Sequence, residues 1–431
     1  MQYAPIDADA ASARGCPHRH GAQPATAHPV DVMDDGIPVA GSAVARPESP
    51  GRPATTEPGP SDPGAATPDP APRFRLGNRP PLTGIRAFGV SVVLIYHSNF
   101  KALPGSWIAL QMFFVLSGFL ITSMLAGEGA RTGRISVRNF YTRRGLRLLP
   151  PLILTVGLLA IYASLVSVAD ASQRLWGDAS AALFYYADYR QAFGHAPFFG
   201  YLAQTWSLSV EEQFYIIWSV LMVVAIATHR RRLAYLFAVL GVALSTADRL
   251  WIIFRAPHFG TAAFTRVYYA FDSRADALFI GCLLGLLAAD GYLQGWKPRS
   301  TRVLKVAAAV STALMVWALT GSHLFTESVA LWWMPASTVA FTIIITYLVI
   351  SPRSLGSRFV GLGVFVFIGD LSYTLYLVHF PVYLALQPEG THWSYWPTEL
   401  LRLAIIFAIA AGSWFLMEKP LTRWRRRPTR A

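Results

Sequence analysis

The stretch Arg86-Ala-Phe-Gly-Val-Ser-Val-Val-Leu-Ile-Tyr-His97 lies within an apolar run that is long enough to cross a bilayer. Arg86 and His97 are eleven residues apart. On an α-helix they therefore share one face and lie about 16 Å apart along the helix axis. Both side chains are costly in lipid, so we expect them to face protein or a polar cavity. The pattern indicates an active-site helix in which Arg86 binds an anion and His97 transfers a proton.

The composition of the whole chain is typical of a membrane protein. Its 431 residues are 53% hydrophobic and only 14% charged, which is less charge than a soluble domain carries. The formal net charge of +13 would also suit a nucleic-acid-binding protein. However, the basic residues cluster in short segments between apolar runs, as the positive-inside rule requires, so no nucleic-acid partner is expected. The two cysteines, Cys16 and Cys282, stand in a polar tail and an apolar run, so no disulfide is predicted.

Residues 1–78 differ in composition from the rest and are rich in Pro, Ala and Gly. We expect a disordered cytoplasmic tail, because this segment buries too little apolar surface to offset its ordering entropy. Residues 79–431 then form the membrane domain. No hydrophobic signal core precedes the first apolar run, so no cleaved signal peptide is expected. Cys16, His18 and His20 stand close together but lack a fourth ligand, so no metal site is predicted.

Apolar runs of bilayer length follow the tail. They lie near 83–99, 107–126, 148–168, 206–227, 233–254, 273–290, 303–321, 331–350, 361–387 and 398–417. Basic residues cluster after the even-numbered runs, as at Arg143, Arg144 and Arg147. This alternation predicts an all-α polytopic protein of about ten transmembrane helices with both termini in the cytoplasm. We expect it to be a multi-pass protein of the cytoplasmic (inner) membrane.

The predicted topology sorts the ionisable residues into two groups by depth. Arg86, Arg144 and Arg147 fall at the cytoplasmic ends of their helices. The second group falls toward the outer half and contains His97, Glu211, Glu212, Asp248, Arg249, Arg274, Asp276 and His379. Because this group mixes both signs, its members can pair, and such a cluster predicts a polar cavity.

Seven short motifs occur in order between about 80 and 425. They are Arg86-x10-His97, Phe113-Phe-Val-Leu-Ser-Gly-Phe119, Arg144-x2-Arg147-x2-Pro150, Trp206-Ser-Leu-Ser-Val-Glu-Glu-Gln-Phe-Tyr215, Asp272-Ser-Arg-Ala-Asp-Ala-Leu-Phe-Ile-Gly281, Leu371-Ser-Tyr-Thr-Leu-Tyr-Leu-Val-His-x-Pro381 and Glu418-Lys-Pro420. With these motifs the chain resembles the integral-membrane acyltransferase family 3. One departure is Thr83, which stands where the family often has an acidic residue.

The resemblance implies an O-acyltransferase. Such an enzyme moves an acyl group, usually acetyl, from acyl-CoA to a hydroxyl of a carbohydrate, glycolipid or glycosylated metabolite. The implied partners are acyl-CoA, a carbohydrate or glycoside acceptor and the lipid bilayer. Acyl-CoA is then a co-substrate, and no permanently bound cofactor is expected.

The residues also fit this chemistry on physical grounds. A hydroxyl that attacks a thioester needs a base with a pKa near neutrality, which the imidazole of His97 supplies, and Glu211 would orient that imidazole. Arg86, Arg144 and Arg147 carry planar guanidinium groups suited to the phosphates of coenzyme A. The candidates for oxyanion or acceptor binding are Ser117, Tyr215, Arg274, Asp276 and His379.

Each assignment has a structural alternative. Arg144 and Arg147 would also serve as topology determinants that contact lipid phosphates. Arg86 would also suit a snorkelling position at the interface, and His97 and His379 would suit interhelical contacts. The motif at Phe113–Phe119 also fits close helix packing.

The alternative function is a polytopic transporter or flippase for a polar or glycosylated substrate. Buried charges among ten helices suit a substrate pathway as well as an active site. Against a transporter, the sequence shows no internal repeat.

Overall fold

A computed structural model of the protein describes residues 77, 79–98, 103–166, 171–194, 200–387 and 394–424. The chain divides into two units, Met1–Thr67 and Pro68–Ala431. All of the described residues belong to the second unit. The predicted disordered tail, residues 1–78, lies outside the described residues except for Gly77.

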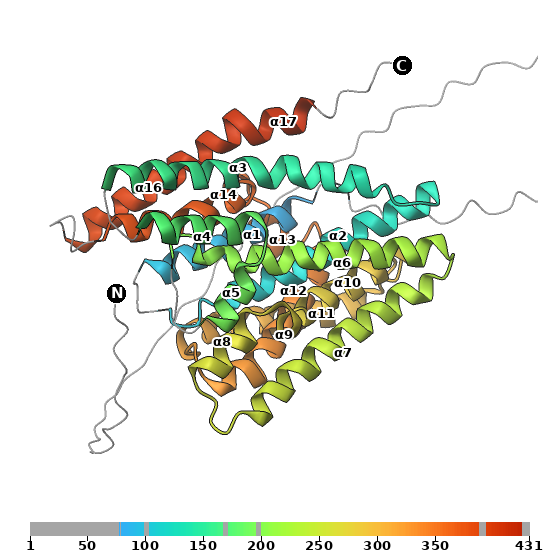
Figure 1. The fold of residues 1–431 in the computed structure, drawn as a ribbon. Helices are drawn as coiled ribbons and strands as arrows, with labels where there is room; N and C mark the ends of the chain where they lie inside the picture. Colours follow the sequence, from blue (N-terminus) through green and yellow to red (C-terminus); the bar gives the residue numbers. More distant parts are fainter. Residues whose placement is uncertain are drawn as a thin grey trace, which may run out of the picture. The chain divides into compact units, whose positions relative to one another are not determined.

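Within the described ranges the structure is helical and contains no strand (Figure 1). The helices in chain order are α1 (Pro80–His97), α2 (Ile108–Thr132), α3 (Val137–Val166), α4 (Ala171–Leu183), α5 (Ala187–Phe193), η1 (Ala203–Thr205), α6 (Trp206–Ala227), α7 (Arg231–Arg255), α8 (Thr261–Tyr269), α9 (Phe271–Arg274), α10 (Asp276–Ala289), α11 (Pro298–Gly321), η2 (Val329–Trp333), α12 (Met334–Ile350), α13 (Leu355–Val360), α14 (Gly363–Ala385), α16 (Tyr395–Ser413), η3 (Trp414–Glu418) and α17 (Lys419–Trp424). Helix η1 is a 3-10 helix, whereas η2 and η3 are π-helical.

Eight helices in the described part of the chain are long and apolar enough to cross a membrane. They cover Ile108–Thr132, Val137–Leu165, Ala203–Ala227, Arg231–Arg255, Pro298–Gly321, Val329–Ile350, Gly363–Ala385 and Tyr395–Leu421. The two remaining runs of the prediction are also helical. One forms α1, and the other forms α9 and the 14-residue α10. The prediction of an all-α polytopic membrane protein is confirmed.

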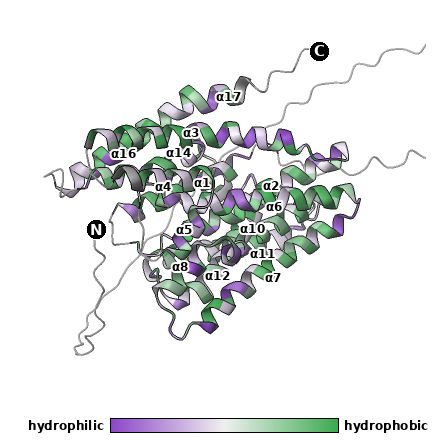
Figure 2. Ribbon diagram, in the orientation of Figure 1, coloured by the Kyte–Doolittle hydropathy of each residue, from purple (hydrophilic) through white to green (hydrophobic). Residues whose placement is uncertain are grey.

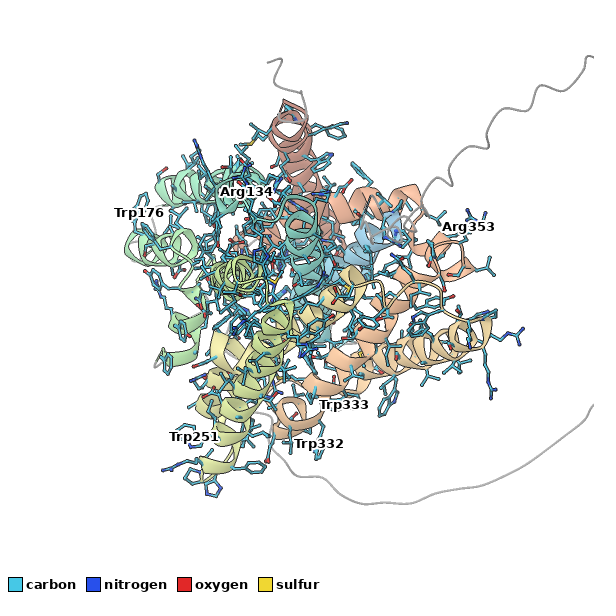
Figure 3. The ribbon with its side chains drawn as sticks, turned by 90° about the vertical axis from the view of Figure 1, so that its right-hand side faces the viewer. Arg134, Trp176, Trp251, Trp332, Trp333 and Arg353 are labelled. Atoms are coloured by element: carbon cyan, nitrogen blue, oxygen red, sulfur yellow. The ribbon has the colours of Figure 1, made fainter. Side chains whose placement is uncertain are left out.

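The lipid-facing character of the bundle is visible on its surface. In Figure 2 the long helices α6 and α7 are coloured mainly as hydrophobic. Large aromatic side chains project from the bundle, and Trp176, Trp251 and Trp332 are 63%, 60% and 67% exposed (Figure 3). Exposed tryptophans of this kind are typical of the interfacial and lipid-contacting surface of membrane proteins.

Helix α3 corrects one predicted boundary. It begins at Val137, whereas the apolar run predicted a start near 148. The Ser136 hydroxyl accepts a hydrogen bond of 3.4 Å from the backbone N–H of Asn139, which caps the first turn. Because arginine favours helix, α3 continues from Val137 through both Arg144 and Arg147 to Pro150 and beyond.

The buried apolar side chains form two clusters. One is built mainly by α2, α6, α7, α8, α10 and α12, and the other mainly by α1, α3, α4, α14 and α16. Helix α1 of the second cluster packs on α2 of the first. Side-chain contacts join α3 to α6 at Arg144 and Glu212, and α14 to α6 at Tyr376 and Ser207. Most of the predicted site residues lie on these five helices.

Glycines allow the backbones to approach closely in both clusters. A Cβ at Gly118 of α2 would strike the carbonyl oxygen of Leu278 in α10, and one at Gly281 would strike that of Val115. Between α1 and α14, a Cβ at Gly369 would strike the carbonyl oxygen of Thr83. Small residues at crossings are the usual basis of tight helix packing in membranes. The packing role considered for the Phe113–Phe119 motif is thus present at Gly118.

We expect Gly118→Ala to destabilise the protein by about 1–3 kcal/mol, because the backbone of α10 must move to admit the methyl group. Gly127→Ala is the matched control, since it lies on the same helix and nothing stands within 4 Å of its added Cβ. Thermal unfolding of purified protein in detergent measures both variants. Equal melting temperatures for the two variants would contradict the packing argument.

Candidate active site

His97, the last residue of α1, lies against His379 of α14. The Nδ1 atom of His97 is 3.0 Å from the carbonyl oxygen of Val93 and 3.3 Å from Nε2 of His379. The Nδ1–H of His379 donates to the carbonyl oxygen of Tyr376 at 2.6 Å. His379 is completely buried, whereas His97 is only partly so. Two of the predicted site residues therefore form one imidazole pair.

Arg144 of α3 is held by two residues of α6. Its Nη2–H donates to Oε1 of Glu212 at 2.8 Å, and its guanidinium carbon lies 3.4 Å from the centroid of the Tyr215 ring. The sequence assigned Arg144 to the cytoplasmic group and Glu212 to the outer group, whereas the structure brings the two side chains together. The guanidinium of Arg144 on α3 therefore neutralises the carboxylate of Glu212 on α6.

Glu211 accepts hydrogen bonds from two other predicted site residues. The Ser117 hydroxyl donates to Oε1 and the Tyr215 hydroxyl to Oε2, each at 3.1 Å. The expectation that Glu211 orients His97 is wrong, since no hydrogen bond joins the two residues in the described structure. The Nδ1 atom of His97 faces Val93 and His379 instead.

Arg86 and Arg147, the arginine pair, have guanidinium groups that make no hydrogen bond or ion pair with another described residue. Both interact electrostatically with Asp370 of α14 and Glu418 of η3. Arg86 also interacts with Glu211. Two guanidinium groups with free donors form a site suited to an anion such as phosphate.

Two of these acidic residues were not among the predicted site residues. Glu418 is 2% exposed and accepts hydrogen bonds from Thr374 at 2.8 Å and Ser413 at 3.1 Å. It ends the π-helix η3, a local geometry that often marks functional sites. Asp370 belongs to no motif core. The only signal for it was an acidic residue inside an apolar run, which membrane helices rarely tolerate without a partner.

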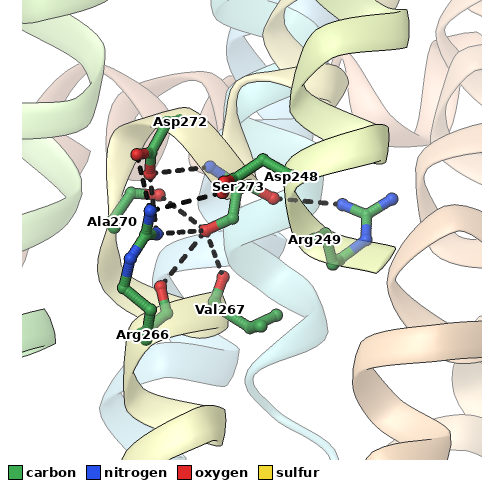
Figure 4. Close-up of polar contacts among 7 residues, drawn as sticks. All are labelled: Asp248, Arg249, Arg266, Val267, Ala270, Asp272 and Ser273. Carbon is green, nitrogen blue, oxygen red and sulfur yellow. Dashed lines mark hydrogen bonds and ion pairs between the residues drawn. The ribbon is translucent and has the colours of Figure 1, made fainter. Parts of the chain in front are cut away.

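Arg249 and Asp276 form a buried ion pair of 2.8 Å, and this pair belongs to a separate charged cluster. In the same cluster Arg266 donates to both carboxylate oxygens of Asp272, at 2.7 and 2.6 Å, and lies 3.3 Å from Asp248 (Figure 4). The predicted pairing of opposite charges is confirmed here. Asp276, offered above as an acceptor-binding candidate, is engaged by Arg249.

Arg274 is fully buried, and its three nitrogens have no hydrogen-bond partner among the described residues. Its guanidinium carbon lies 4.6, 5.3 and 5.6 Å from the ring centroids of Tyr268, Phe114 and Trp206. Cation–π attraction stabilises the charge in place of hydrogen bonds. With no exposed surface, this guanidinium does not face a space that would admit a ligand.

No metal centre is formed by the described residues, since no group of three or more His, Cys, Asp or Glu side chains could hold an ion. The Cys16, His18 and His20 segment lies outside the described residues.

The pattern of an imidazole pair and an arginine pair on helices α1, α3 and α14 can be compared with known proteins. An acyltransferase-domain family model matches residues 81–418. The chain belongs to this acyltransferase family. The comparisons do not favour the transporter or flippase alternative.

The chain is similar to several O-acetyltransferases. The chain is 30% identical over 359 residues to peptidoglycan O-acetyltransferase OatA of Listeria monocytogenes, covering 80% of this chain and 56% of that protein. It is 28% identical over 320 residues to O-acetyltransferase OatA of Staphylococcus aureus, covering 70% of this chain and 50% of that protein. The chain thus spans about half the length of these relatives. No solved structure matches it.

The site yields a prediction about the ion pair between Arg144 and Glu212. We expect Arg144→Ala to destabilise the fold by about 3–5 kcal/mol, because it leaves the Glu212 carboxylate buried without its partner. The neighbouring Arg143 is the control, since its side chain is 46% exposed and lies 3.6 Å from Glu128, so its loss costs at most about 1 kcal/mol. Unfolding in detergent measures both, and restored stability in the Arg144→Ala/Glu212→Ala double variant would confirm the pairing.

Proposed function

We propose that this acyltransferase is a membrane O-acetyltransferase that uses acyl-CoA as donor and a hydroxyl of a cell-surface carbohydrate, such as peptidoglycan, as acceptor. The observation that carries the proposal is that helix α1 contains both a candidate donor-binding residue and the candidate general base. Arg86 belongs to the arginine pair, and His97 belongs to the imidazole pair three turns away. Both relatives are named O-acetyltransferases, which supports the acetyl group, and the Listeria monocytogenes protein is named a peptidoglycan O-acetyltransferase, which supports the acceptor.

The donor would bind by its phosphates at the arginine pair. Arg86 and Arg147 retain free N–H donors, and guanidinium groups bind phosphate in a bidentate geometry. Asp370 and Glu418 lie close enough to attract the two guanidinium groups. Arg144, also proposed for donor binding from the sequence, is already paired with Glu212, so we assign it to holding α3 on α6.

The pantetheine arm of the donor would place the thioester near His97. The acceptor hydroxyl transfers its proton to His97 while its oxygen attacks the thioester carbonyl carbon. When the tetrahedral intermediate collapses, the carbon–sulfur bond breaks, and the imidazolium returns the proton to the leaving thiolate. The products are an acetyl ester and free coenzyme A, with His97 neutral again.

Glu211 would act on the donor side. Its two oxygens accept hydrogen bonds from Ser117 and Tyr215, and its charge attracts Arg86. The two hydroxyl groups therefore fix a carboxylate that positions the guanidinium of Arg86. We propose that the donor enters from the cytoplasm, because the positive-inside rule predicts that Arg86 and Arg147 lie near the cytoplasmic side of the membrane.

We expect His97→Ala to lower kcat by about 10²–10⁴-fold, because a general base contributes that much to proton transfer. Acetyl transfer by purified protein in lipid nanodiscs, with labelled acetyl-CoA and a peptidoglycan fragment, measures the effect. Near-normal kcat in a folded His97→Ala preparation would rule out His97 as the base.

We expect Arg86→Ala to raise the KM for acetyl-CoA by roughly 10- to 100-fold, because a charge-assisted contact with phosphate is worth about 1.5–3 kcal/mol. The KM for the acceptor should change much less. Arg86→Lys restores the affinity only in part, since the bidentate geometry is lost. Arg138→Ala is the control, because Arg138 is exposed near the start of α3. An equal effect on both KM values would place Arg86 outside the donor site.

A further inference from the structure

The hydrogen bonds of the imidazole pair determine where its protons lie. The Nδ1 atom of His379 faces the Tyr376 carbonyl oxygen at 2.6 Å, so Nδ1 carries the proton and Nε2 carries the lone pair. The Nδ1 atom of His97 faces two acceptors, the Val93 carbonyl oxygen and that lone pair. A bare Nδ1 would repel both, so His97 must also be protonated on Nδ1.

We propose that His379 is a positioning residue that holds His97 in its Nδ1–H tautomer and thereby makes Nε2 of His97 the basic atom. This inference rests on the proposed function, in which His97 is the base. It replaces Glu211 as the group that orients the imidazole. The orienting acceptors are thus a neutral histidine and the Val93 carbonyl oxygen, and His97 has no carboxylate partner among the described residues.

The burial of His379 favours a positioning role over substrate binding. His379 has no exposed surface, and its ring packs near Tyr376, Phe380 and Tyr383, with centroid distances of 5.5, 6.2 and 6.2 Å. A ligand therefore has no space in which to touch it. His97 is partly exposed, and its Nε2 bonds to no described residue.

The geometry also argues against a proton relay through His379. A proton that reached Nε2 of His379 could leave only through Nδ1, which already donates to a backbone carbonyl oxygen. A carbonyl oxygen does not accept a proton near neutral pH. His379 therefore orients His97 and stabilises its imidazolium form, and the proton stays on His97 Nε2 until the thiolate leaves.

Hydrogen bonds from η1 and α6 hold the part of α14 that contains Tyr376 and Leu377. The Gln204 side chain donates to the carbonyl oxygen of Leu377 at 2.7 Å, and the Tyr376 hydroxyl donates to the Gln204 carbonyl oxygen at 2.7 Å. The Ser207 hydroxyl lies 2.7 Å from the same tyrosine oxygen. These bonds fix α14 at the point where the Tyr376 carbonyl meets His379.

The first test compares variants at position 379. We expect His379→Leu to lower kcat by about 10- to 100-fold, as is typical when a residue that orients a catalytic group is removed, with little change in either KM. His379→Gln should recover much of the loss, because its carbonyl oxygen can accept from His97 near the position of Nε2. Val378→Ala is the packing control, since it removes volume from the neighbouring buried position. Wild-type kcat in folded His379→Leu would overturn the proposal, and a raised acceptor KM with unchanged kcat would place His379 in acceptor binding instead.

The second test reads the tautomer directly and does not depend on activity. Nitrogen-15 NMR of histidine-labelled protein in nanodiscs distinguishes protonated from bare ring nitrogens, and the His97→Gln variant assigns the His97 signals. We expect wild-type His97 to be protonated on Nδ1 alone. His379→Leu should show a larger share of the Nε2–H tautomer, because it removes one of the two acceptors of the Nδ1–H and leaves only the Val93 carbonyl oxygen. A proton on Nε2 of wild-type His97 would overturn the inference. If instead the tautomer is as expected but His97→Ala remains active, the proposed function fails while the pairing stands.

Discussion

A polar side chain buried among apolar helices has no water to bond, and this constraint explains most of the arrangement in this protein. The carboxylate of Glu212 lies against Arg144, and Asp276 lies against Arg249. Glu418 is satisfied by Thr374 and Ser413. Where hydrogen-bond partners are missing, as at Arg274, aromatic rings surround the charge. The arginine pair differs from these groups, because Arg86 is only partly buried, Arg147 is exposed, and both keep free donors.

Much of the fold could be predicted from the sequence, because apolar length and helical period are local properties. The shared face of Arg86 and His97 and the helical nature of every predicted run follow from such patterns. The start of α3 was missed, since arginines in a helix do not look apolar even when the helix continues through them. The Ser136 cap, which fixes this boundary, does not change the hydropathy pattern.

Which candidate site residues contact one another was harder to predict from the sequence than which residues are candidates. His97, His379, Arg86 and Arg147 were all candidates from the sequence, yet Glu211 was paired with the wrong residue. Which carboxylate meets which cation depends on helix rotation and on depth in the bundle, and neither can be read from one chain's spacing. Asp370 was missed for a related reason, because one acidic residue in an apolar run does not reveal its partners.

The glycine contact between α1 and α14 has a further consequence. Because Thr83 of α1 touches Gly369 of α14 backbone to backbone, the two helices are joined at the end that carries Arg86 and Asp370. The same two helices are joined at the other end by His97 and His379. Contacts at both ends of the helix pair keep the distance between Arg86 and His97 constant. Under the proposed function, the helix pair selects donors whose phosphates and reactive carbon are separated by that distance, whatever acyl group they carry.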